Sequence, residues 1–64
     1  MCETDVYLKK NDGSETLIMK DSASILLKDG GVDIYDIIGK HERIDSAEIE
    51  SVNFIKHRAI IRNV

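Results

Sequence analysis

The chain is short and mildly acidic, and its size and charge exclude several classes of protein. It has 64 residues, 12 acidic and 9 basic side chains, and a formal net charge of −3. A chain of about 60 residues buries only about 60% of its unfolded surface, so we expect one domain over residues 1–64 with a marginal core. The negative charge gives no general attraction to nucleic acid or anionic membranes. No apolar run is long enough to cross a membrane, and the chain start lacks the pattern of a secretory signal.

Short alternating runs predict strands in the first half of the chain. The first run carries Val6 and Leu8 on one face, and similar runs follow at residues 17–19 and 25–27. Alternation with period two is typical of half-buried strands, and the many β-branched residues suit them.

The second half continues in the same way, with glycines between the runs. Val32 and Ile34 flank Asp33, and alternation returns at residues 59–61. Three segments between the runs are typical of turns: Asn11-Asp12-Gly13, Asp29-Gly30-Gly31 and Gly39. Their glycine and Asp-Gly residues permit the positive φ angles of tight hairpins.

One stretch, residues 44–49, allows two interpretations. Asp45 could cap a short helix, with Glu48 at its third position and Ile44 packed against Ile49. The apolar phase also slips between Ile49 and Val52, which a bulged strand would explain. We favour the strand.

These elements together predict a mostly β fold of about six or seven short strands. So many strands in 64 residues leave little room for a sandwich, so a small SH3-like or Sm-like barrel is the economical architecture. An edge left unpaired could bind a second copy of the chain.

The only cysteine, Cys2, is the candidate metal ligand. At the chain start its thiolate lies next to an amine and amide nitrogens, which together form chelate rings with one metal ion. Such donors suit nickel(II) or copper(II) better than zinc, and two chains could supply four of them. Cys2 could instead be an apolar residue of the first strand, or an exposed thiol that oxidises. His41 and His57 lie by turns, so we expect solvated side chains and assign neither as a ligand.

The chain as a whole resembles the CooT family, small nickel-binding proteins associated with maturation of carbon monoxide dehydrogenase. The resemblance extends over nearly the whole sequence. It is carried by the MCE start, VYLKK, TLIMKD, the strand near Val32–Gly39 and the closing NFIKHRAII. Where many relatives carry a leucine-rich stretch, this chain has Tyr35-Asp36-Ile37-Ile38.

The resemblance implies a small β-barrel, a homodimer and nickel(II) bound through the cysteine at position 2, here Cys2. We therefore expect a cytoplasmic metallochaperone or nickel-storage protein with a nickel-enzyme client such as carbon monoxide dehydrogenase. We expect no enzymatic activity, since no nucleophile, base and orienting group stand together and a small barrel is filled by side chains.

The alternative is an RNA-binding or protein-interaction module, because small barrels often bind RNA. The residues that would serve RNA binding are the cations Lys56, Arg58 and Arg62 and the aromatics Tyr7, Tyr35 and Phe54. The negative charge and the few aromatics argue against it, and Phe54 is better interpreted as a core residue.

Overall fold

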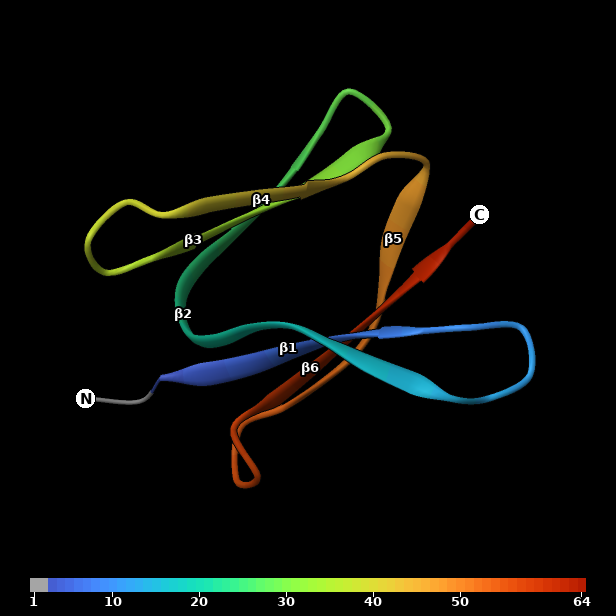
Figure 1. The fold of residues 1–64 in the computed structure, drawn as a ribbon, viewed down its shortest axis with the longest axis horizontal. Coiled ribbons are helices and arrows are strands. Elements are labelled where there is room, and N and C mark those ends of the chain that lie inside the picture. Colours follow the sequence, from blue (N-terminus) through green and yellow to red (C-terminus); the bar gives the residue numbers. More distant parts are fainter. Residues whose placement is uncertain (1–2) are drawn as a thin grey trace.

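The computed structural model describes residues 3–64, whose six strands form one mixed β-sheet (Figure 1). The strands are β1 (Thr4–Lys9), β2 (Glu15–Lys28), β3 (Gly31–Asp36), β4 (His41–Ile44), β5 (Ala47–Asn53) and β6 (Arg58–Asn63). Their order in the sheet is β4-β3-β2-β1-β6-β5. The prediction of a small, mostly β fold with about six strands is confirmed. In the described part of the chain there is no helix, and hence none that could cross a membrane.

The ambiguous stretch at residues 44–49 is a strand, a turn and a strand. β4 ends at Ile44 and β5 begins at Ala47. The Asp45 carboxylate accepts a hydrogen bond from the Arg43 side chain at 2.7 Å instead of capping a helix. The bulge expected in this region is confirmed, because the β5–β6 register shifts between Ile49 and Ser51.

β2 is the element that curls the sheet. Its first half pairs with β1 and its second half with β3, so the two apolar runs at residues 17–19 and 25–27 belong to one long strand. Asp21 has φ 54°, and the ribbon bends sharply along β2 (Figure 1). The polar residues at the bend interrupt the alternation, which explains why the runs look separate in sequence.

The curled sheet is not closed into a complete barrel. β4 and β5 are its two edges, although the Ala47 N–H donates to the Gly30 carbonyl at 3.2 Å and so joins the start of β5 to the turn between β2 and β3. The first and last strands are neighbours: β1 pairs in parallel with β6, with Val6 opposite Ala59. This pairing places the first and last strands inside the sheet instead of at its edges.

The core lies inside the curl and is made mainly of β-branched residues. Its buried members are Val6, Met19, Val32, Ile34, Ala47, Ala59 and Ile61. Burial of each large aliphatic side chain stabilises the fold by about 1.5–3 kcal/mol. Phe54 is not among them, so its interpretation as a core residue is wrong. It is 80% exposed because β5 ends at Asn53, whose side chain accepts two backbone N–H bonds and starts the turn.

Candidate functional site

The start of β1 at Thr4 is held by hydrogen bonds, and the predicted ligand, Cys2, comes two residues earlier in the sequence. Cys2 itself is outside the described residues, which begin at Glu3. The Thr4 carbonyl accepts a hydrogen bond from the Ser22 hydroxyl at 2.6 Å. Since Ser22 is 4% exposed, the bond anchors β1 from its first residue to the bend of β2.

The last hairpin also reaches the start of β1. The Asp5 N–H donates to the His57 carbonyl at 2.9 Å, and the Asp5 carboxylate accepts the Asp21 N–H at 3.0 Å. His57 lies in the β5–β6 turn with φ 55° and is exposed, which confirms its predicted place at the tip. The sequence alone does not predict that His57 lies beside β1, because this contact depends on the parallel pairing of β1 with β6.

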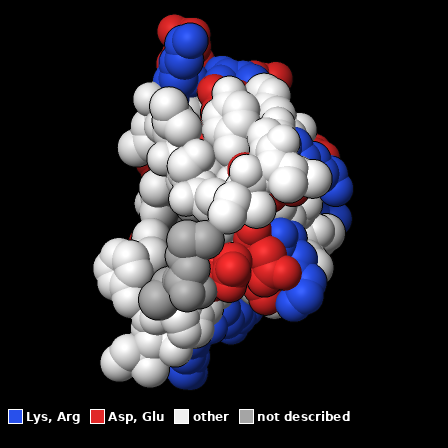
Figure 2. All heavy atoms as spheres, turned by 90° about the vertical axis from the view of Figure 1, so that its left-hand side faces the viewer, with Lys and Arg blue, Asp and Glu red and all other residues white. Residues whose placement is uncertain are grey.

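An open apolar groove of about 250 Å³ begins at the same place. It is lined by Thr4, Ser22, Ala23, Ser24, Ile25, Ile49, Val52, Phe54 and Ala59. None of these side chains is charged. Uncharged side chains also cover most of the molecule's face on the side where β1 starts, with acidic groups near its middle (Figure 2). This end of the sheet therefore offers apolar surface beside the beginning of the described chain.

His41 is exposed, as the sequence suggested, but it is the first residue of β4 and does not lie in the turn. Its Nε2 lies 2.6 Å from one Asp33 carboxylate oxygen, and its ring stacks on Tyr35 with centroids 4.6 Å apart. Arg43 donates to the other Asp33 oxygen at 2.8 Å. The hydrogen bond to His41, together with the positive charge of Arg43, holds the pKa of Asp33 below its usual value.

This network was missed in the sequence because Asp33 alternates with Val32 and Ile34. That alternation indicates a solvent-facing side chain, yet Asp33 is only 7% exposed. His41 and Arg43 cover it from the neighbouring strand. β3 pairs with β4 so that Asp33 lies opposite Arg43, and this register could not be predicted from the sequence.

The described residues contain no ready-made metal centre. Within residues 3–64 no three His, Cys, Asp or Glu side chains lie together in a group that could hold a metal ion. The contacts of His41 are instead the hydrogen bond and stacking of a structural network.

Two of the three cations considered for RNA binding, Arg58 and Arg62, are engaged in other contacts. Arg58 stacks over the Tyr7 ring at 4.5 Å and pairs with Glu15 at 2.5 Å. Arg62 pairs with Glu48 at 2.9 Å. No geometric observation favours RNA binding over the other candidate functions.

Comparison with known proteins adds two findings. A family model described as CO dehydrogenase accessory protein CooT matches residues 1–62. A crystal structure of a protein assigned as CooT from Carboxydothermus hydrogenoformans superposes with a TM-score of 0.85, 21% sequence identity and 98% coverage of each chain. At that identity the structure supports the likeness of fold alone. No curated protein sequence matches the chain.

Proposed function

Because this chain belongs to the CooT family of CO dehydrogenase accessory proteins, we propose that it binds nickel(II) through Cys2 and carries it for a nickel enzyme. The observation that carries the proposal is the family match over residues 1–62, which includes the only cysteine of the chain. Carbon monoxide dehydrogenase is the client that the family description favours. The protein acts as a carrier or store and has no catalytic role of its own.

The chemistry of the chain start supports nickel as the cargo. A thiolate with an adjacent amine and amide nitrogens provides sulfur and nitrogen donors without help from a folded cavity. Such donors favour the square-planar or tetragonal geometry that nickel(II) adopts. The site exchanges ligands readily, so it can pass its ion to a client with a deeper site. A cytoplasmic location, where thiols stay reduced, fits a function that depends on a free cysteine.

We propose further that two copies of the chain share the metal, with the apolar groove as part of their interface. Thr4 lines the groove, so an interface there lies close to the chain start of each copy. Two chain starts brought together at a two-fold axis supply four donors to one ion. The exposed Phe54 and Val52 at the groove give this face the apolar surface that an interface core needs.

The experiment is a nickel(II) titration of the reduced native protein beside Cys2→Ser. Binding is followed by sulfur-to-nickel absorption, and native mass spectrometry counts the ions per dimer. We expect one ion per two chains and loss of the absorption in Cys2→Ser, with an unchanged circular dichroism spectrum. A double variant, Cys2→Ser with Ser14→Cys, restores one exposed thiol in the turn between β1 and β2, at the other end of β1 from the chain start.

The double variant separates the chelate from the thiol alone. If Cys2 acts together with its neighbouring nitrogens, the relocated thiol does not restore binding. Affinity of the native protein should also fall as pH is lowered, because a thiolate ligand must lose its proton to bind. Full nickel binding by Cys2→Ser, or an affinity independent of pH, would contradict the proposal.

A further inference from the structure

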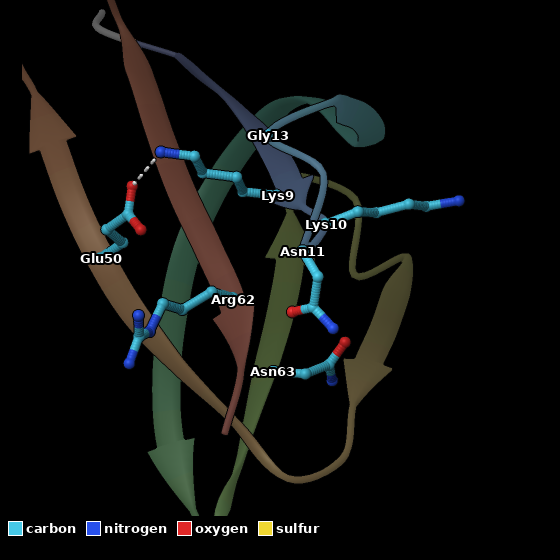
Figure 3. A pocket seen from close by; sticks show the side chains of 7 residues that line it. All are labelled: Lys9, Lys10, Asn11, Gly13, Glu50, Arg62 and Asn63. Carbon is cyan, nitrogen blue, oxygen red and sulfur yellow. Dashed lines mark hydrogen bonds and ion pairs between the residues drawn. The ribbon is translucent and has the colours of Figure 1, made fainter.

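A second open hollow, unrelated to the chain start, lies at the far end of β1. It has a volume of about 260 Å³ and is formed where β1 and the β1–β2 turn meet β5 and β6. Its lining is Lys9, Lys10, Asn11, Gly13, Glu50, Arg62 and Asn63 (Figure 3). We call this hollow the polar pocket. Nothing in the family match or in the proposed nickel site accounts for it.

The polar pocket is cationic in a protein that is anionic as a whole. Three cations, Lys9, Lys10 and Arg62, and one acid, Glu50, line the polar pocket, and Glu48 pairs with Arg62 from outside the lining. Cations therefore exceed the nearby acids by one, whereas the complete chain carries a net charge of −3. A hollow lined mainly by one sign of charge focuses the field and raises the local concentration of ions of opposite sign. The polar pocket therefore attracts anions.

The cations keep donors that their ion pairs do not use. Lys9 lies 3.2 Å from the Glu50 carboxylate, and an ammonium group has three N–H donors. Arg62 binds the Glu48 carboxylate through Nε at 2.9 Å, which leaves its two terminal NH₂ groups for another acceptor. Both ion pairs lie at the surface, where such pairs are weak and easily rearranged.

Two amide side chains complete the donor set. Asn11 and Asn63 point toward one another across the pocket, while Lys10 extends outward from the rim (Figure 3). Asn63 donates to the Asp45 carbonyl at 3.2 Å, but the Asn11 amide has no hydrogen bond to any described residue. Gly13 leaves the turn side open, since nothing lies within 4 Å of the place where a Cβ would stand.

From this geometry we propose that the polar pocket binds a small oxyanion, either a phosphate or a carboxylate. Arg62 and Lys9 neutralise its charge, and the Asn11 amide donates a hydrogen bond to it. Charge-assisted bonds to oxyanions are the strongest that such side chains form. The volume is below the roughly 300–1,000 Å³ of sites for drug-sized ligands, so it suits an ion of a few atoms.

The test is a titration of metal-free Cys2→Ser protein with inorganic phosphate and, separately, with acetate. The backbone amide signals of Asn11, Gly13 and Asn63 and the side-chain amide signals of the two asparagines are followed by NMR, with sodium chloride at matched ionic strength as the reference. We expect saturating shifts confined to these residues. Saturation by phosphate or by acetate identifies the preferred oxyanion, and either supports the proposal. Using Cys2→Ser makes the result independent of nickel binding.

Three variants then distinguish a site from general charge attraction. Arg62→Gln and Lys9→Gln should each raise the dissociation constant, by about fivefold for the loss of one exposed charge-assisted bond. Lys40→Gln is the matched control, because Lys40 is an exposed lysine in a hairpin turn outside the polar pocket and its loss changes net charge equally. Shifts that never saturate, shifts reproduced by chloride, or equal weakening by Lys40→Gln would each overturn the proposal.

Discussion

The two hollows of this sheet are nearly equal in size and opposite in character. The apolar groove, of about 250 Å³, is lined by no charged side chain, whereas four of the seven residues around the 260 Å³ polar pocket are charged. The same strands supply both. β1 contributes Thr4 to the groove and Lys9 to the pocket, and β6 contributes Ala59 and Arg62 in the same way.

The difference shows how a small sheet can present two independent surfaces. Along β1 and β6 the buried residues Val6, Ala59 and Ile61 are apolar, and the residues near the strand ends differ in chemistry. An apolar groove suits another protein chain, whose side chains it can cover, whereas a cationic pocket suits a solvated ion. The two surfaces rest on the same core, and variants that change one surface should leave the other unaffected.

The largest expected effect comes from removing part of the shared core. Ile61 is fully buried on β6, and Ile61→Ala should lower the free energy of unfolding by about 2–5 kcal/mol. Dimerisation through the apolar groove and oxyanion binding in the polar pocket should both weaken, because β6 contributes to each of them. Urea unfolding measures the loss. Ile55→Ala removes the same atoms from a side chain that is 91% exposed and should leave stability unchanged.

A change in the apolar groove should affect association without affecting the polar pocket. Phe54→Ser removes an aromatic anchor, and loss of such a residue from an interface costs about 2 kcal/mol or more, roughly a thirtyfold weaker dimer. Sedimentation over a range of concentrations measures it. Ile38→Ser is the control, because Ile38 is 87% exposed but does not line the groove. Equal weakening by both variants would place the interface elsewhere.

Gly31 tests a hairpin that belongs to neither hollow. A Cβ at Gly31 would lie 2.6 Å from the Arg43 side chain and 2.8 Å from the Ile44 carbonyl. Gly31→Ala should therefore destabilise the fold by about 1–3 kcal/mol through crowding and displace Arg43 from Asp33. Oxyanion binding in the polar pocket should persist. Unchanged urea unfolding in this variant would contradict the prediction and show that Arg43 and Ile44 move aside at little cost in stability.

The smallest expected effect is the acid dependence of the same hairpin. The hydrogen bond from His41 and the charge of Arg43 lower the pKa of Asp33 in the folded protein from its ordinary value of 3.8. The ionised carboxylate therefore stabilises the fold fully above the unfolded pKa, and this contribution is lost as pH falls through the lower folded value. Asp33→Asn should flatten the dependence of the urea midpoint on pH below about 4. The pKa of Asp12 is also lowered, because its carboxylate accepts a hydrogen bond from the Ser14 side chain. The variant Asp12→Asn therefore measures the contribution of Asp12 to the pH dependence of stability.

Most of the fold follows from local patterns in the sequence. Alternation predicts the strands, Asp29-Gly30 predicts a tight hairpin, and the residues adopt the required positive φ angles of 54° and 74°. The phase slip after Ile49 correctly indicates the bulge in β5. These features depend on neighbours in the chain, so one sequence is enough to find them.

The remaining features depend on contacts between distant segments. The bend at Asp21 keeps β2 continuous through a polar stretch, and Phe54 is exposed because its strand ends one residue earlier. The polar pocket joins residues from the β1–β2 turn with Arg62 near the chain end, and no spacing in the sequence brings them together. Cys2 could be selected as a candidate because its donors are adjacent in the chain itself.

The parallel pairing of β1 with β6 has a consequence for the order of events in the cell. Translation delivers β1 first, but one edge of that strand stays without its partner until β6 has left the ribosome. Contacts between such distant segments form slowly, because a long loop must close before they are made. The carbonyl of His57 that holds Asp5 also arrives only then. On the proposed function, the donors at the chain start are therefore made first, whereas the pairing that holds β1 in the folded protein is completed last.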